Sequence, residues 1–310
     1  MRAMQVSKPK TVFAILVMLG KAPSIFIMLI LLVGANSTGC AADDILPMES
    51  RVLKPGLVAH DFQIPSNTGG KGDIFFIESS NNDYPVRIIG GRGSIGSLSY
   101  RFPASISELI SIDAPVVVSG AYASRVGSVL LPLGYLRSGD TIISGRFHKS
   151  WMVDSVFCTD ASGSKNSIFP TETFKRDLGP GYTDCAQTGP RLLENGGGGV
   201  ESLDDGNSDR EAYIRWSRIQ LFICKADDNP NSPLGIGITS DRMALHTLDT
   251  ILPKLRINGR RVCNNAVSLS NGISAGMLIN GSLVAGSGTF LNTSALAFVR
   301  RGSRTSRKLK

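Results

Sequence analysis

Short apolar segments, each ended by glycine, proline, asparagine or serine, follow one another along the chain from Val58 onward. Segments this short are typical of β-strands, because helices need longer stretches to bury one face. Within Ser97–Phe102, the apolar residues Leu98, Tyr100 and Phe102 alternate with polar ones, which is the period of a half-buried strand. Turn residues recur roughly every 8–15 residues, a spacing that favours a sandwich or barrel. We therefore predict an all-β protein.

The predicted strands of the first half share an apolar centre and ends rich in turn residues. They are Leu57–Ile64, Asp73–Glu78, Pro85–Ile89, Ser97–Phe102, Pro115–Ser119, Ser128–Leu133, Thr141–Phe147 and Trp151–Cys158. The second half opens with one long predicted strand, Tyr213–Cys224, and closes with the alternating strand Phe290–Val299. Between these two strands, Asp241–Leu252 is a predicted helix, which Asp241 caps and Pro253 stops.

Three Asn-Gly dipeptides lie in the second half, at Asn258-Gly259, Asn271-Gly272 and Asn280-Gly281. Both central residues of a tight hairpin turn take positive φ, which asparagine and glycine tolerate best. We therefore predict a hairpin at each site, with Ile257/Arg260 and Ile279/Ser282 as flanking pairs. The chain would end as a meander of antiparallel strands.

Composition changes over residues 159–210, where glycines, prolines and acidic residues replace the apolar segments. The run Asn195–Gly199 holds the most glycine, which populates both signs of φ. We place a linker at 195–210, between an N-terminal β domain at 43–194 and a C-terminal β domain at 211–299. The predicted fold class is thus all-β, with two antiparallel Ig-like β-sandwich domains in tandem.

The N-terminus has the pattern of an export signal. Two lysines precede the apolar run Thr11–Gly20, and a second run, Ser24–Ala35, follows. Neither run reaches the roughly 20 residues that a membrane span needs, so we predict a signal peptide at 1–39. Translation from Met18 would explain the doubled arrangement, and an uncleaved anchor is the alternative.

Cys40 stands at the exit of this leader. Ordinary cleavage before Asp43 would remove it, whereas cleavage in front of Cys40 itself, after Thr38-Gly39, would resemble lipobox processing and lead to lipidation. In both cases Cys40 is not available for a disulfide, because it is either removed or lipidated. Four cysteines then remain, and in an oxidising compartment an even number suggests two disulfides. Four cysteines allow three connectivities, of which we favour the sequential one, Cys158–Cys185 with Cys224–Cys263. The spacing of these cysteines does not favour a zinc site.

The formal net charge of +8 belongs to the chain ends. Residues 1–39 and the tail 300–310 are basic without any acid, while the rest of the chain carries 23 basic and 25 acidic residues. A nucleic-acid-binding domain would carry a basic patch on its folded body. The charge pattern therefore argues against a nucleic-acid partner.

Motifs for catalysis or cofactors lack their required context. Gly91–Gly96 has the dinucleotide spacing, but no helix pattern follows it, and Ser162–Lys165 has no partner motif of penicillin-binding enzymes. The acidic stretch Asp205–Asp209 lacks the glycine and glutamate of a calcium loop. We predict no catalytic residue, no metal and no cofactor. Trp151 and Tyr135 could form a sugar-binding platform, although a tryptophan in an alternating strand more often packs in the core.

The last hundred residues resemble bacterial fimbrial tip adhesins and minor pilins of the chaperone–usher type. Cys224, Cys263 and the alternating segment Gly288–Val299 carry this resemblance. It implies an incomplete sheet that another pilus subunit completes by donating a strand. Further partners it implies are a periplasmic chaperone and a host glycan or surface receptor. The contact residues would be Phe290, Leu296 and Phe298.

We therefore expect an exported, non-enzymatic surface protein, a fimbrial minor subunit or adhesin that mediates attachment. Its 43–194 domain would be adhesive or lectin-like, and its 211–299 domain pilin-like. The alternative is an outer-membrane lipoprotein with a scaffold role, anchored through Cys40. A secreted hydrolase without a recognisable motif is the third hypothesis. The expected location is the cell surface, a fimbrium or the outer membrane.

Overall fold

The computed structural model describes residues 44–68, 70, 72–79, 83–90, 114–126, 129–177, 181–200, 207–286 and 293–301. The predicted leader at 1–39, Cys40, the Gly91–Gly96 motif, the strand at Ser97–Phe102 and residue Phe290 all lie outside these ranges.

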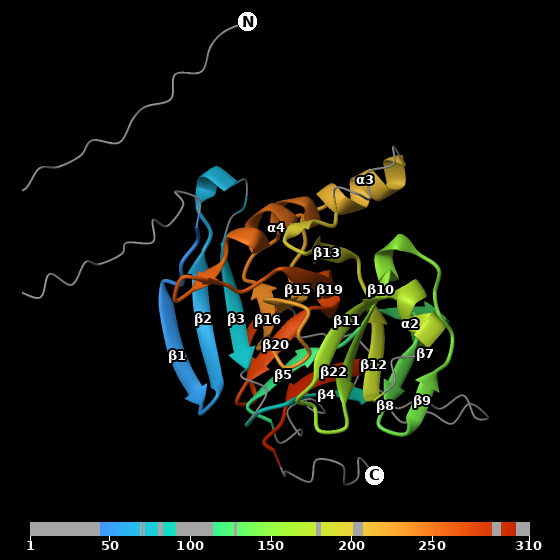
Figure 1. Cartoon of the computed structure of the whole chain (residues 1–310). Coiled ribbons are helices and arrows are strands. Elements are labelled where there is room, and N and C mark those ends of the chain that lie inside the picture. The colour runs from blue at the N-terminus through green and yellow to red at the C-terminus, as the bar shows by residue number, and fades with distance from the viewer. Residues whose placement is uncertain are drawn as a thin grey trace, which may run out of the picture. The chain divides into compact units, whose positions relative to one another are not determined.

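Antiparallel strands make up most of the regular structure, which confirms the all-β expectation in its coarse form (Figure 1). The largest sheet has eight strands. In spatial order they are β1 (Glu49–Lys54), β2 (Leu57–Gln63), β3 (Asp73–Ser79), β16 (Leu234–Thr239), β15 (Gln220–Lys225), β19 (Asn265–Asn271), β13 (Arg191–Glu194) and β14 (Gly197–Gly198).

The described residues form two further sheets of five strands each and two sheets of two strands each. One five-stranded sheet runs β21 (Ser282–Gly286), β20 (Gly276–Ile279), β5 (Val116–Ser119), β22 (Ser294–Phe298), β4 (Val86–Gly90). The other runs β11 (Asn166–Pro170), β10 (Ser155–Asp160), β12 (Tyr182–Thr188), β8 (Leu136–Ser138), β9 (Thr141–Ser144). The two-stranded sheets are β17 (Arg256–Ile257) with β18 (Arg260–Arg261), and β6 (Ala123–Val126) with β7 (Val129–Pro132).

Helices are short. The α-helices of the described residues are α2 (Thr171–Asp177), α3 (Ser208–Arg215) and α4 (Leu245–Ile251). Single 3₁₀ turns are η1 (Ser66–Thr68), η2 (Trp151–Val153), η4 (Leu252–Lys254) and η5 (Gly272–Ser274). None of the helices in the described residues is long and apolar enough to cross a membrane.

Strands from both halves of the sequence alternate within the same sheets. β3 pairs with β16 along its length, and β5 lies between β20 and β22. Figure 1 shows the blue strands β1 to β3 directly beside the orange strands β16 and β15. The tandem Ig-like sandwiches are therefore not confirmed, and the division predicted at 195–210 has no counterpart in these sheets. The physical reason is that edge strands of each half find their hydrogen-bonding partners in the other half.

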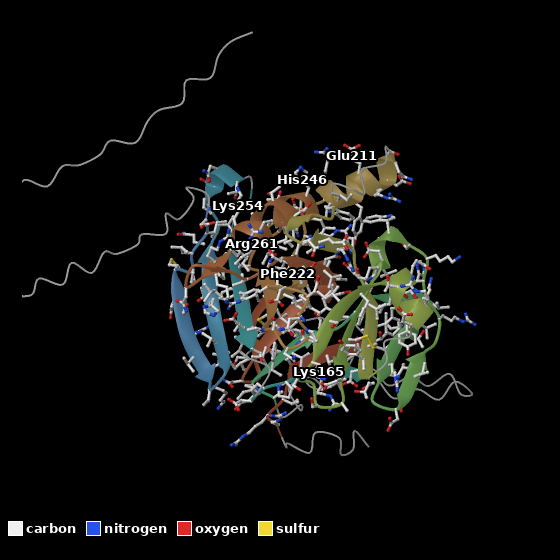
Figure 2. The ribbon with its side chains drawn as sticks, in the orientation of Figure 1. Lys165, Glu211, Phe222, His246, Lys254 and Arg261 are labelled. Carbon is white, nitrogen blue, oxygen red and sulfur yellow. A yellow bond between two sulfur atoms is a disulfide. The ribbon has the colours of Figure 1, made fainter. Side chains whose placement is uncertain are left out.

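The central strands of the eight-stranded sheet are buried on both faces, whereas its outer strands β1 and β14 are mostly exposed. Ile77 and Ile223 face a cluster shared with the sheet of β4, β5, β20, β21 and β22, while the neighbouring residues Phe76 and Phe222 face a second cluster, which α4 covers. Figure 2 shows Phe222 inside the fold, with His246 on α4. Burial on two faces explains why β15 and β3 contain continuous apolar runs instead of an alternating pattern.

Two glycines of β16 make room for aromatic rings that cross the sheet. A Cβ atom at Gly235 would lie 1.9 Å from the Phe76 ring, and one at Gly237 would lie 2.2 Å from the Phe222 ring.

We expect Gly235→Ala to lower the free energy of unfolding by about 1–3 kcal/mol, because the Phe76 ring must leave its position. Urea unfolding measures this loss. Gly145→Ala is the control, since its Cβ would meet nothing closer than 3.8 Å, and equal losses in both variants would contradict the prediction.

Two of the three predicted hairpins are confirmed. Asn258-Gly259 joins β17 to β18 with φ values of 51° and 75°, and Asn280-Gly281 joins β20 to β21 with 49° and 79°. The expected flanking pairs, Ile257 with Arg260 and Ile279 with Ser282, are register partners. At Asn271-Gly272, however, β19 ends and the η5 turn begins, so no hairpin forms there.

The predicted strand Tyr213–Cys224 is divided. Its first residues belong to α3, where the Asn207 side chain accepts hydrogen bonds from the amides of Asp209 and Arg210, and β15 begins only at Gln220. The capping asparagine stabilises helix where the apolar pattern alone indicates strand. The helix predicted at Asp241–Leu252 is shorter in the structure, where α4 spans Leu245–Ile251. Its N-cap residue is Ala244, which makes no side-chain cap hydrogen bond, so Asp241 is not the cap.

Both predicted disulfides are confirmed. Cys158–Cys185 joins directly opposed residues of β10 and β12, and Cys224–Cys263 ties β15 to the segment before β19. Disulfides are typical of proteins that fold in an oxidising compartment, which agrees with an exported protein.

Strand β22 is paired on both edges by this chain, with β4 on one side and β5 on the other. Leu296 and Phe298, the expected strand-donation residues within the described part of the chain, are fully buried in the chain's own core. This arrangement differs from the expected one, since β22 offers no free edge to a donor strand.

The end of β15 holds a buried lysine. The Lys225 ammonium donates to the carbonyls of Asn166 and Asn229, at 2.6 and 2.9 Å. Burial lowers the pKa of Lys225 to about 8, an effect that outweighs the opposing influence of Asp227 and Asp228. The folded state therefore releases this proton before the unfolded state does.

This pKa difference predicts that stability rises with pH between about 8 and 10. In that range the unfolded chain binds the Lys225 proton more fully, and the gain approaches about 3 kcal/mol by pH 10.5. Urea unfolding at half-unit pH steps measures this slope. Lys225→Met removes the titrating group, so its profile should be flatter than that of the parent chain, and parallel profiles would contradict the prediction.

Candidate functional site

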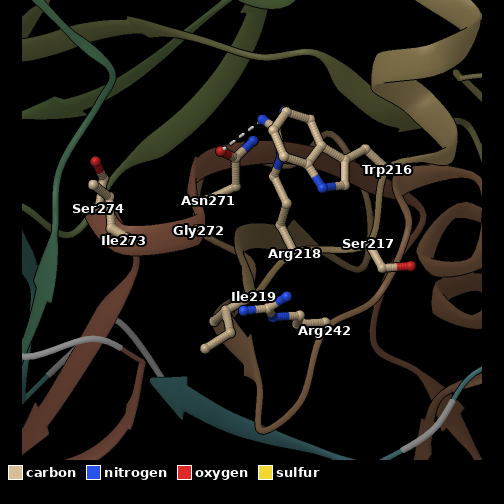
Figure 3. Close-up of a pocket in the computed structure, with 9 residues that line it drawn as sticks. All are labelled: Trp216, Ser217, Arg218, Ile219, Arg242, Asn271, Gly272, Ile273 and Ser274. Carbon is tan, nitrogen blue, oxygen red and sulfur yellow. Dashed lines mark hydrogen bonds between the residues drawn. The ribbon is translucent and has the colours of Figure 1, made fainter.

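A cavity of about 570 Å³ opens where α3, β15, α4 and β19 meet. Three separate chain segments line it: the link between α3 and β15, the approach to α4, and the η5 turn. The lining residues are Trp216, Ser217, Arg218, Ile219, Arg242, Asn271, Gly272, Ile273 and Ser274 (Figure 3).

Main-chain hydrogen bonds hold these three segments together. Arg218 and Met243 exchange two backbone hydrogen bonds of 3.1 and 2.8 Å, which fixes Arg242 beside Arg218 in the lining. The amide of Gly272 donates to the carbonyl of Ile219 at 2.8 Å, and Gly272 has a φ of 59°, which favours glycine at this turn. The cavity rim is therefore built by backbone and not by side-chain contacts alone.

The Arg218 side chain is held between two aromatic rings. Its guanidinium carbon lies 3.7 Å from the Trp216 ring centroid and 4.2 Å from that of Tyr213. One nitrogen also donates to the side-chain oxygen of Asn271 at 3.4 Å, the contact dashed in Figure 3. Stacking on two rings restricts the rotamers of a long side chain, so the charge is pre-positioned at the cavity.

Asn271 connects this arginine to a network of hydroxyl groups. Its side-chain nitrogen donates to Tyr213 at 2.8 Å and to Tyr122 at 3.0 Å, and the Tyr122 hydroxyl lies 3.0 Å from that of Ser268. Desolvation, with the neighbouring Tyr213 as a smaller cause, raises the pKa of Tyr122 well above its usual value. Tyr122 is therefore neutral at physiological pH. The hydrogen bonds of this network orient Asn271, which in turn accepts from Arg218.

The cavity is electropositive. The described residues that line it include two guanidinium groups, Arg218 and Arg242, and none of them is a carboxylate. Figure 3 shows the two arginines entering from different segments, with Ile219 beside Arg242. Arginine presents planar donor pairs that match phosphate and carboxylate oxygens, so the arrangement suits an anion.

The two aromatic residues considered from the sequence have different surroundings. Tyr135 is buried and stacks on Phe147 with ring centroids 4.9 Å apart, so it belongs to the core. Trp151 is half-buried in η2, outside the strand predicted for it, and its ring lies 5.2 Å from that of Tyr213. It lines a second cavity, together with Arg210 and Glu172 among others.

The remaining motif residues have structural surroundings. Ser162–Lys165 forms the turn between β10 and β11, where the Asp160 carboxylate accepts from the amides of Ser164 and Lys165. Asn207, in the acidic stretch, caps α3. The described residues contain no cluster of three metal-ligating side chains. The histidines lie on separate elements: His60 in β2, His148 before η2 and His246 in α4.

Sequence reasoning missed Trp216, Arg218, Arg242 and Asn271. The first two lie inside the stretch interpreted as one strand, and Asn271 was interpreted as a turn residue. The sequence did contain a sign that this stretch is not one strand. Arg215 and Arg218 interrupt the apolar residues at a spacing that does not fit strand alternation.

No protein-family model and no curated protein matches this sequence. Among solved structures, the chain is similar to the catalytic domain of zebrafish N-acetylglucosamine-1-phosphodiester α-N-acetylglucosaminidase, auto-inhibited by its pro-peptide. The TM-score is 0.57 at 15% identity, over 82% of this chain and 83% of that one. A hypothetical protein from Synechocystis gives a TM-score of 0.54 at 13% identity, over 80% of this chain and 63% of that one. A structure named "putative exported protein" from Burkholderia pseudomallei gives a TM-score of 0.46 at 8% identity, over 74% of each chain.

The expectation of a non-enzymatic protein is corrected by the first of these likenesses, because the fold is shared with the catalytic domain of an enzyme. The expectation rested on short linear motifs of catalysis. In this fold the candidate site is assembled from three distant segments, and no linear motif describes it.

Proposed function

We propose that this chain is an exported hydrolase that releases a sugar from a phosphodiester. The observation that carries the proposal is the composition of the Arg218 cavity: among the described residues that line it are two guanidinium groups and one indole ring, and none of these described residues is a carboxylate. Its volume of about 570 Å³ lies within the usual range for small-molecule sites.

Each part of the substrate has a matching group. The phosphodiester monoanion would lie between Arg218 and Arg242, whose planar donors fit phosphate oxygens. The sugar would stack on Trp216, whose residue surface is 61% exposed although its ring already holds Arg218 on one side. An exposed indole with an apolar face and a polar N–H is suited to a sugar ring.

The chemistry is compatible with a site whose described lining residues include no carboxylate. Water adds to the anomeric carbon, the bond from that carbon to the phosphate oxygen breaks, and the electron pair stays on the phosphate. The phosphate leaves as a monoester that carries the proton from water, so atoms and charge balance. Because this leaving group is stabilised as an anion, arginines can take the place of a general acid.

The solved structure with a TM-score of 0.57 supports the proposal, since its printed name describes an enzyme acting on an N-acetylglucosamine-1-phosphodiester. The proposal for this chain stands on its own cavity, because the two sequences share only 15% identity.

The test uses the full chain, expressed with export so that both disulfides form. The probe is the methyl phosphodiester of N-acetylglucosamine, and release of free sugar is followed by chromatography. A neutral methyl glycoside of the same sugar is the control, and it should not be cleaved. Absence of both binding and cleavage of the phosphodiester would overturn the proposal.

A further inference from the structure

We propose that two copies of this chain associate through the outer edge of β1, in an antiparallel register centred on Ser50. The eight-stranded sheets of the two copies then continue into each other. None of the described strands pairs with this edge, since β1 ends its sheet and β2 takes its other side (Figure 1). An open edge presents N–H and C=O groups that a second strand can pair. The inference is independent of the proposed function.

Apolar side chains are exposed along this edge. Val52 is 72% exposed, and Met48, directly before β1, is 67% exposed. In the register centred on Ser50, Met48 of one copy lies opposite Val52 of the other, on the same face of the joined sheet. The two-fold axis repeats this contact, so the pairing covers both apolar residues in both copies.

The charges of β1 are self-complementary in the same register. Glu49 of one copy lies opposite Arg51 of the other, and the axis repeats this pair as well. A two-fold axis perpendicular to the sheet keeps every residue on its face, so the axis must pass through a residue position. An axis at Glu49 or at Arg51 would place two like charges directly opposite each other, which destabilises a strand pair. The order of charges therefore favours Ser50 as the centre.

Within one copy, Glu49 faces another acid. Its register partner on β2 is Asp61. Burial raises the pKa of Asp61, Glu49 raises it further, and Arg51 opposes both effects. Neither Glu49 nor Arg51 forms an ion pair with another residue in the described part of the chain. Arg51 of the second copy supplies an opposite charge on the outer side of Glu49.

Sedimentation velocity of the full exported chain over a wide range of concentration measures this association, and we expect a reversible monomer–dimer equilibrium. Glu49→Arg and Arg51→Glu should each raise the dissociation constant about tenfold or more, because two like-charge pairs replace two opposite-charge pairs. An equimolar mixture of these two variants should associate like the parent chain, since each opposed pair in the mixed dimer again carries opposite charges.

Val52→Lys tests the apolar contact and should also weaken the dimer. Val126→Lys is the matched control, because Val126 is a 59% exposed valine on β6, outside this edge, and it should leave association unchanged. Thermal unfolding establishes that each variant is folded. A parent chain that stays monomeric at every concentration would overturn the inference. A dimer that Glu49→Arg, Arg51→Glu and Val52→Lys leave unchanged would do the same, as would a mixture of the two charge variants that fails to associate.

Discussion

Arg218→Ala is expected to lower kcat/KM for the glycosyl phosphodiester by about 10²–10³-fold, the usual loss when one pre-positioned donor to a developing oxyanion is removed. The reason is geometric as well as electrostatic. Arg218 is stacked between Trp216 and Tyr213 and bonded to Asn271, so its charge needs little reorganisation when the leaving phosphate forms. Initial rates at several substrate concentrations give kcat and KM separately.

Two variants make this result interpretable. Arg218→Lys keeps the charge but loses the planar donor pair, so it should recover only part of the activity. Arg215→Ala removes an exposed guanidinium from the end of α3, outside the cavity, and should act like the parent chain. Thermal unfolding of each variant establishes that the fold is retained. A folded Arg218→Ala variant with unchanged kcat/KM would refute the assignment of the cavity.

Replacing Cys224 and Cys263 together by alanine is expected to lower the free energy of unfolding by about 4 kcal/mol. The bridge joins residues 39 apart, and its loss restores the conformational entropy of that loop to the unfolded chain. The loop includes α4 and Arg242, so the Arg218 cavity should also loosen. Urea unfolding, followed by the fluorescence of Trp151 and Trp216, measures the stability.

The second bridge offers a matched comparison. Cys158–Cys185 closes a loop of similar length, 27 residues, between β10 and β12, so its removal should cost nearly as much stability. The lining of the Arg218 cavity lies outside that loop. Ligand affinity below the unfolding transition should therefore fall further in the Cys224/Cys263 variant, and equal affinities would contradict a link between this bridge and the site.

Much of the local structure was predictable, and the failures have identifiable causes. Asn258-Gly259 and Asn280-Gly281 form hairpins because their flanking strands pair with each other. Asn271-Gly272 has the same residues, but β19 pairs with β15 and β13 instead, so Asn271 is available to the cavity. Similarly, the stretch Tyr213–Cys224 is apolar enough for one strand, yet the Asn207 cap starts a helix that ends at Arg215.

The candidate site was not predictable for a related reason. Arg218, Arg242 and Asn271 are separated by more than twenty residues each, and none belongs to a recognised motif. They meet because Arg218 pairs with Met243 and because Gly272 bonds Ile219. These are long-range backbone contacts, and their register depends on the entire eight-stranded sheet.

The order of residues along the chain was sufficient to predict a mostly β fold and two turns, and it limited the four cysteines to three connectivities. The strands and turns follow from conformational preferences that act over a few residues. The small number of connectivities follows from there being only four cysteines to pair. Only the tertiary structure decided that both halves share their sheets, that β22 is paired on both edges by this chain and that Arg218 and Arg242 line one cavity. Those outcomes arise from edge-to-edge hydrogen bonding and two-sided burial, which depend on residues far apart in sequence.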